Sequence, residues 1–194
     1  MSFSGGVKEE LAKRHGNARH CQIAELTAII CMCGKIKLNE YGYYIVVSSD
    51  NSEVIKKTAY LTKKILGIEL EIVIHSKKAD IYQMRYEDAD TVREILEVTK
   101  LTIKEEEQEV YAFVINPIII QNMCCRRCFL RGAFLVAGSV SNPEKAYHFE
   151  IVCNEEGIAE IVKNVLIDFE IDAKIVLRKK YFVPMINTGF TRVL

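Results

Sequence analysis

The chain has 194 residues, 49% hydrophobic and 27% charged, which is enough to bury a substantial core and excludes a disordered protein. Because 26 Lys and Arg balance 26 Asp and Glu, the formal net charge is zero. A uniformly basic nucleic-acid coat is therefore excluded, and any DNA contact must come from a local basic patch. The sequence has neither the run of about 18 apolar residues that a membrane span needs nor a signal peptide, which predicts a cytoplasmic protein without a membrane partner.

Residues 1–18 predict a short amphipathic helix, since Val7 and Leu11 lie four residues apart. After it, the chain repeats its pattern of apolar residues with an offset of 104. Cys21 aligns with Cys125, and Gly34 aligns with Gly138. The register of apolar positions continues downstream of these pairs, which indicates an internal duplication.

Both copies predict the same order of elements. An apolar helix comes first, at residues 21–34 and 125–138, and each ends at a glycine suited to a left-handed helix C-cap. A strand, a second helix and another strand follow. Asn51 and Asn154 are expected to be the N-caps of the second helices. The predicted ranges are 41–48, 52–66 and 68–76 in the first copy, and 146–153, 155–169 and 171–179 in the second.

A further strand, 81–86, and a helix, 88–98, complete the first copy. Small residues in the apolar helices permit close packing of one helix against the other on a pseudo-two-fold axis. The second copy is incomplete, because no counterpart of helix 88–98 is evident. The expected organisation is an N-terminal helix (1–18), a first repeat (19–104), a connection (105–122), a second repeat (123–186) and a divergent tail (187–194).

Residues 130–139, LRGAFLVAGS, resemble the signature helix of the LAGLIDADG homing endonucleases. The resemblance implies an α+β fold of two αββαββα-type repeats that lays a saddle of strands on DNA. Residues 124–150 (CCRRCFLRGAFLVAGSVSNPEKAYHFE), with the opening SFS and VKEEL, resemble more closely the WhiA family of sporulation and cell-division regulators of Gram-positive bacteria. This resemblance covers residues 1–183.

The WhiA resemblance implies a nucleoid-associated, DNA-binding regulator of transcription in sporulation, cell division and chromosome segregation, working with other regulators. That family carries a C-terminal helix-turn-helix domain after the endonuclease-like part. Because the sequence ends at Leu194, we expect a truncated chain that lacks this domain. The alternative function is a protein-interaction scaffold that leaves DNA binding to the missing domain.

The endonuclease family places an acidic residue near the end of each signature helix, where two carboxylates hold divalent metal. The matching positions here are Cys33 and Ala137. The second signature helix contains no carboxylate, and Glu25 lies two turns away in the first. Neither a thiol nor a methyl group suits a hard cation. The sequence therefore predicts a protein that is not an enzyme, with no catalytic residues.

DNA binding by the chain depends on clusters of basic residues. If the strands form a basic rim, we expect weak, salt-sensitive and non-specific binding, and reversing residues 178–180 should remove most of it. The alternative is that each of these residues is an ordinary solvated charge. The candidate residues are Lys35, Lys37, Lys77, Lys78, Arg126, Arg127, Arg131, Arg178, Lys179 and Lys180.

Seven cysteines are more consistent with free thiols in a reducing compartment than with a disulfide framework. Cys125 and Cys128 have the spacing of half a zinc knuckle, but no second Cys-x-x-Cys follows. Free cysteine is also a common small core residue. The sequence therefore predicts no bound metal and no cofactor, with a zinc site shared between the two halves as the alternative.

Overall fold

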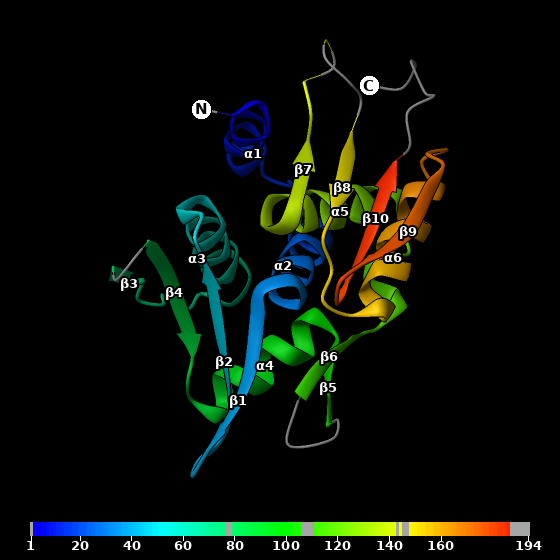
Figure 1. The fold of residues 1–194 in the computed structure, drawn as a ribbon. Coiled ribbons are helices and arrows are strands. Elements are labelled where there is room, and N and C mark those ends of the chain that lie inside the picture. The colour runs from blue at the N-terminus through cyan, green and yellow to red at the C-terminus, as the bar shows by residue number, and fades with distance from the viewer. Residues whose placement is uncertain (1, 77–78, 106–110, 143, 145–147, 187–194) are drawn as a thin grey trace.

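The computed structural model describes residues 2–76, 79–105, 111–142, 144 and 148–186. Two helices, α2 (Arg19–Cys33) and α5 (Met123–Ala137), lie side by side at the centre, and one sheet flanks them on each side (Figure 1). These are the two apolar helices predicted from the sequence. Each begins two residues earlier than predicted and ends one residue earlier.

The two sheets have the same topology, which confirms the duplication and the α+β fold. In the first, β1 (Gly34–Asn39), β2 (Gly42–Ser49), β3 (Val73–Ser76) and β4 (Asp80–Tyr86) are antiparallel in the order β1-β2-β4-β3. In the second, the order is β7-β8-β10-β9. Its strands are β7 (Gly138–Val140), β8 (Phe149–Ile151), β9 (Ala173–Arg178) and β10 (Tyr181–Ile186).

The remaining helices are α1 (Phe3–Lys13), α3 (Ser52–Leu66), α4 (Ala89–Thr99) and α6 (Glu156–Ile167). Asn51 caps α3 as predicted, because its side chain accepts a hydrogen bond from the Glu53 amide at 3.0 Å. The prediction for Asn154 is wrong: Glu155 occupies the N-cap position of α6, and its side chain makes no capping hydrogen bond.

A hairpin of β5 (Leu101–Glu105) and β6 (Tyr111–Ile115) follows α4, and a short 3-10 helix (Pro117–Ile120) then leads into α5. Strand β6 lies within the predicted connection (105–122), and Phe113 and Ile115 of this strand are buried. The divergent tail (187–194) and residues 77–78 lie outside the described residues.

The predicted left-handed C-caps at Gly34 and Gly138 are wrong, because both residues have φ −78° and begin a strand. Glycine is needed there for space. A Cβ on Gly34 would lie 2.4 Å from the carbonyl oxygen of Ile30, and one on Gly138 would lie 2.2 Å from the ring of Phe134. The strand that Gly34 begins, β1, was absent from the predicted elements.

The hydrophobic core is centred on α2 and α5. Ala24, Leu26, Ala28, Ile29 and Ile30 of α2 are fully buried, and α5 contributes Phe129 and Leu135. The apolar helices are therefore enclosed by other elements rather than lying on the surface. Within the described residues, no helix has both the length and the apolar character needed to cross a membrane.

Candidate nucleic-acid interface

The first sheet presents basic side chains on the face opposite its helices. Ile45, Val47 and Met84 point into the core. In an antiparallel pair, residues directly opposite each other share a face, and neighbouring residues along a strand alternate. Val46 lies opposite both Lys35 and Arg85, and Lys37 lies opposite Tyr44. Lys35, Lys37 and Arg85 therefore share the exposed face of this sheet.

The equivalent face of the second sheet is closer to neutral. Met185 lies opposite both Glu150 and Lys174, which places these two charges on one face. Arg178 lies four residues after Lys174 in β9 and therefore on the same face of the sheet. It donates a hydrogen bond of 2.6 Å to Glu150 Oε2. His148 Nε2 also lies 3.0 Å from Glu150 Oε2. The carboxylate of Glu150 thus offsets the charge of Arg178.

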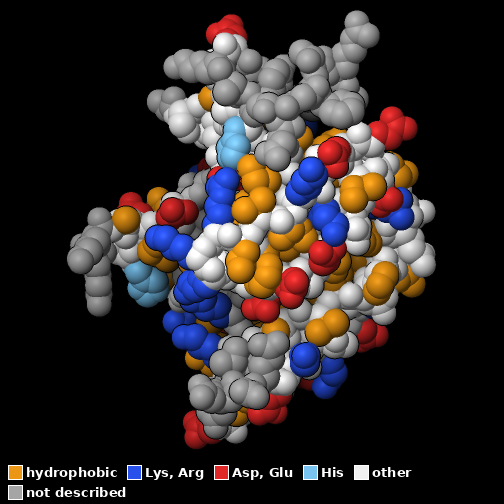
Figure 2. All heavy atoms as spheres, turned by 45° about the vertical axis from the view of Figure 1, so that its right-hand side comes forward, with side chains coloured by type: hydrophobic (Ala, Val, Ile, Leu, Met, Phe, Trp, Pro, Cys, Tyr) orange, Lys and Arg blue, Asp and Glu red, His pale blue; other side chains and the backbone are white. Residues whose placement is uncertain are grey.

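We call the exposed faces of the two sheets the saddle face. Its basic residues are Lys35, Lys37, Arg85, Lys174 and Arg178. Lys179 and Lys180 extend it at the exposed turn between β9 and β10. Figure 2 shows one side of the molecule, on which Lys and Arg side chains gather in a band next to hydrophobic and acidic ones. Arg85 and Lys174 were not among the predicted residues. Each alternates with apolar neighbours in the sequence, a pattern that could have placed its side chain on the exposed face of a strand.

Arg126 and Arg127 do not join the saddle face. They lie near the beginning of α5, whereas Lys35 and Lys37 follow the end of α2. The Arg126 guanidinium donates to the carbonyl of Ile120 at 2.9 Å and lies 3.3 Å from Asp168. Arg127 lies over the ring of Phe169, 5.7 Å from its centroid. Both side chains therefore fasten α5 to the segment after α6.

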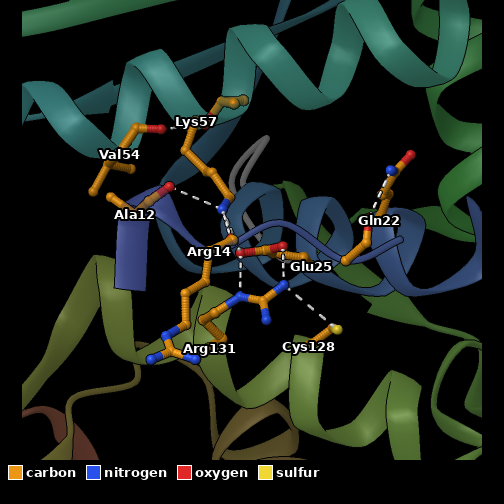
Figure 3. A network of polar contacts seen from close by, with 10 residues as sticks. Ala12, Arg14, Gln22, Glu25, Val54, Lys57, Cys128 and Arg131 are labelled. Atoms are coloured by element: carbon orange, nitrogen blue, oxygen red, sulfur yellow. Dashed lines mark hydrogen bonds and ion pairs between the residues drawn. The ribbon is translucent and has the colours of Figure 1, made fainter. Parts of the chain in front are cut away.

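Arg131, one of the predicted DNA contacts, is mostly buried. Its side chain is only 13% exposed and donates two hydrogen bonds to Glu25, from Nε at 2.8 Å and from Nη2 at 2.5 Å. Figure 3 shows this pair joining α5 to α2. Hydrogen bonding to Glu25 raises the pKa of Arg131. A guanidinium held in this way is unavailable to a phosphate.

Lys57 of α3 is the third member of this buried network. Its Nζ lies 3.3 Å from Glu25 Oε1, and its side chain is 1% exposed. It also donates to the carbonyl oxygens of Ala12, at 3.0 Å, and Arg14. Burial lowers the pKa of Lys57, and the charge of Glu25 opposes that shift. The network therefore ties α2, α3, α5 and the C-terminal end of α1 together around one carboxylate (Figure 3).

The ends of α2 and α5 carry no carboxylate. Cys33 and Ala137, the positions that match the catalytic acids of the endonuclease family, are the last residues of these helices. Cys33 Sγ donates to the Ile29 carbonyl at 3.3 Å, and burial raises the pKa of this thiol to about 12. A protonated thiol and a methyl group do not bind Mg²⁺, which takes oxygen ligands. Glu25, the acid of α2, is engaged by Arg131 and Lys57.

Comparison with known families matches both halves of the chain. Residues 19–102 match the WhiA N-terminal LAGLIDADG-like domain, and residues 126–189 match the WhiA LAGLIDADG-like domain. A "Probable cell division protein WhiA" of Lachnoclostridium phytofermentans is 41% identical over 97% of this chain and 62% of its own length. One of Alkaliphilus oremlandii is 36% identical over 97% and 61%. The chain thus spans about three fifths of the length of these relatives.

Solved structures agree with the family match. The N-terminal LAGLIDADG domain of DUF199/WhiA has a TM-score of 0.73 at 24% identity, covering 96% of this chain and 84% of its own. Full-length DUF199/WhiA from Thermatoga maritima has a TM-score of 0.70 at 26% identity, covering 96% and 57%.

The fold likeness extends to a nuclease. I-DmoI, solved in complex with DNA and Mn, has a TM-score of 0.61 at 16% identity, covering 88% of this chain and 91% of its own. At that identity the likeness shows the fold alone. Three observations agree: two WhiA family models match successive parts of the chain, the relatives are named WhiA, and the duplicated fold is centred on paired signature helices. The chain therefore belongs to the WhiA family and carries its two LAGLIDADG-like domains.

Proposed function

We propose that this WhiA-family chain binds DNA through the saddle face and acts in the regulation of cell division. The observation that carries the proposal is the shared face of Lys35, Lys37 and Arg85 on the first sheet. The fold of I-DmoI, whose structure was solved with DNA, supports it, and so do relatives named as cell division proteins. Roles in transcription during sporulation and in chromosome segregation, and a place at the nucleoid in the cytoplasm, are parts of the same proposal.

The proposed contacts go to phosphates. Lysine and arginine side chains that contact phosphates fix the position of a protein on the DNA duplex, but they do not read the base sequence. Such binding has a dissociation constant of about 10⁻⁴ to 10⁻⁶ M at physiological salt and weakens steeply as salt rises. The net charge of zero adds no general attraction. We therefore expect weak and non-specific binding. More of it should come from the first sheet, where Lys35 and Lys37 add to the Arg85–Glu87 pair, than from the second, where Glu150 offsets Arg178.

Reversing two charges on the saddle face should reduce DNA affinity on the order of tenfold or more. In the variant Lys35→Glu/Lys37→Glu, two phosphate contacts are lost, so the slope of log affinity against log salt should decrease in magnitude by about 2. The measurement is fluorescence anisotropy with labelled duplexes of different sequence at several salt concentrations.

A charge-matched control separates local contacts from net charge. Lys56 and Lys64 are exposed on α3, which packs on the other side of the first sheet. The variant Lys56→Glu/Lys64→Glu has the same net charge as the saddle variant and should bind almost as wild type does. Equal losses in both variants would contradict a DNA interface on the saddle face. Nanomolar, sequence-selective binding would show that this face reads bases.

We also propose that the domain does not cleave DNA. Its signature helices end in Cys33 and Ala137 where a nuclease needs two carboxylates. Supercoiled plasmid incubated with the protein and Mg²⁺ or Mn²⁺ should stay intact. The variant Cys33→Asp/Ala137→Asp should also fail to become an efficient nuclease, because no supporting residues position the new acids. Nicking that scales with protein through successive purification steps would refute this proposal.

One observation favours the alternative, a protein-interaction scaffold. The outer strands of the two sheets, β3 and β9, carry exposed apolar side chains at equivalent positions: Val73, Ile74, Val176 and Leu177. An exposed apolar edge strand is a template for pairing with another chain. If the saddle variant retains DNA binding while Ile74→Lys and Leu177→Lys abolish an association detected by analytical ultracentrifugation, the scaffold function is the better supported one.

A further inference from the structure

Four metal-binding side chains meet where α2 and α5 begin. His20 and Cys21 lie in the first turn of α2, and Cys124 and Cys125 lie in the first turn of α5. One ligand atom from each, the His20 ring nitrogen and the three Sγ atoms, lies within 4.8 Å of all the others. His20 Nδ1 is 3.1 Å from Cys125 Sγ and 3.5 Å from Cys21 Sγ. Two segments more than a hundred residues apart thus converge on one point.

The four residues are two equivalent pairs. The offset that aligns Cys21 with Cys125 also aligns His20 with Cys124, so each repeat supplies two adjacent donors from the same turn of its signature helix. The pseudo-two-fold axis of the fold therefore passes close to the cluster. A tetrahedron has two-fold axes of its own. Two pairs of ligands related by a rotation of 180° can therefore occupy the four corners of a tetrahedral metal site.

The donor set suits zinc. One histidine nitrogen and three thiolates form a common structural zinc site, with Zn–S of about 2.3 Å and Zn–N of about 2.0–2.1 Å. Tetrahedral geometry then places neighbouring donors about 3.5–3.8 Å apart, so the present spacings require only small movements. Both donor pairs lie in the first turns of their helices. Burial, together with the neighbouring thiols, raises the pKa of Cys21 to about 12 and also raises the pKa of Cys125, so a zinc ion must displace these thiol protons when it binds. Cys21 and Cys125 are buried, while His20 and Cys124 are exposed and leave the site open to an incoming ion.

We propose that His20, Cys21, Cys124 and Cys125 bind one structural zinc ion, which clamps the beginnings of the two signature helices together. The sequence-based expectation of no metal relied on the missing second Cys-x-x-Cys motif, and the structure removes that reason by completing the ligand set across the two repeats. Cys128, the other half of the sequence motif, instead accepts a hydrogen bond from Arg131 Nη2 at 3.5 Å.

The clamp lies at the opposite end of α2 and α5 from Cys33 and Ala137. These 15-residue helices are about 20 Å long. The buried network around Glu25 lies between the two ends. Fixing the helix beginnings would set the angle between the helices and hence the angle between the sheets that extend from their other ends. The proposed ion is structural and takes no part in hydrolysis.

The test is the metal content of the chain purified under reducing conditions without chelator. We expect one zinc per chain by elemental analysis. Replacement by Co²⁺ should give the visible absorption bands of a tetrahedral thiolate site. Cys124→Ser, a change at an exposed position, should reduce bound zinc at least tenfold and lower the Tm on the order of 10 °C. Cys33→Ser, at the other end of α2, should keep both zinc and the cobalt spectrum.

Three results would overturn the proposal. The first is substoichiometric zinc in folded protein even after refolding with added Zn²⁺. The second is full zinc retention in the folded Cys124→Ser and Cys125→Ser variants. The third is a count of two fewer free thiols than the seven cysteines after denaturation with chelator, which would show a disulfide within the cluster. Circular dichroism of each variant separates loss of metal from loss of fold.

Discussion

Replacing Glu25 with Gln should lower the free energy of unfolding by about 3–5 kcal/mol. Glu25 is fully buried and is the anion between two cations, Arg131 and Lys57, whose side chains are 13% and 1% exposed. A glutamine fills the same space but leaves both cations without a counter-charge in the protein interior. Removing one partner of a buried ion pair is costly because the remaining charge keeps its desolvation penalty.

The measurement for this prediction is urea denaturation followed by circular dichroism. Glu10→Gln is the matched control, since Glu10 also pairs with an arginine, Arg14, but on the surface, where the side chains are 69% and 67% exposed. That change should cost less than about 1 kcal/mol. The prediction fails if Glu25→Gln costs no more than Glu10→Gln, because the network would then add little to the stability of the α2–α5 pair.

The repeat could be predicted from the sequence because its signal is periodic and occurs twice. The amphipathic helix at 52–66 was predicted to the residue, and its Asn51 cap follows from the side-chain chemistry of asparagine. Strand β1 was missed because four of its six residues are exposed and the strand lies directly after a long apolar helix. Its alternation is too weak to separate it from a loop.

The buried ion network could be predicted only in part. Glu25 is the one acid of a helix whose buried positions are mostly apolar, which signals that a partner must exist, because a buried carboxylate without one is too costly. Its partners lie at positions 57 and 131, and only the folded chain brings these together. Arg131 was therefore grouped with the surface cations from its charge alone.

The metal-binding cluster was closer to being predictable. The alignment that pairs Cys21 with Cys125 also pairs His20 with Cys124 one residue earlier. A search for local spacing motifs cannot find such a site, because the ligands of each half are adjacent and the halves lie far apart in the sequence. Combining the repeat with a close helix pair on a two-fold axis was the step that could have found it.

Gly132→Ala should destabilise the protein by about 1–3 kcal/mol, although alanine is the better helix former. Gly132 lies within α5 where that helix crosses α2. A Cβ there would lie 2.6 Å from the Glu25 carbonyl oxygen and 3.1 Å from the Ala28 Cβ. The nearer contact is with backbone, which cannot turn aside as a flexible side chain would. The helices must therefore separate, and Gly132→Val should cost more than Gly132→Ala.

Gly157→Ala is the opposite case and serves as the control. Gly157 lies in α6, and a Cβ there would meet nothing within 4 Å. Helix propensity acts alone at that position, so the substitution should be neutral or should stabilise the protein by up to about 1 kcal/mol. Urea denaturation of both variants gives the comparison. If both substitutions raised the free energy of unfolding by the same amount, the space between α2 and α5 at Gly132 would be large enough for a methyl group, and the prediction would be wrong.

The effect of Gly132→Ala should reach the saddle face. The new methyl group would push against the turn of α2 that contains Glu25. The carboxylate of Glu25 accepts hydrogen bonds from Arg131, the residue that precedes Gly132 in α5. Separating the helices therefore strains the buried network and changes the angle between the two sheets. If both sheets contact one duplex, folded Gly132→Ala protein should bind DNA more weakly than wild type with every basic residue intact. Unchanged affinity in folded variant protein would mean that a single sheet carries the binding.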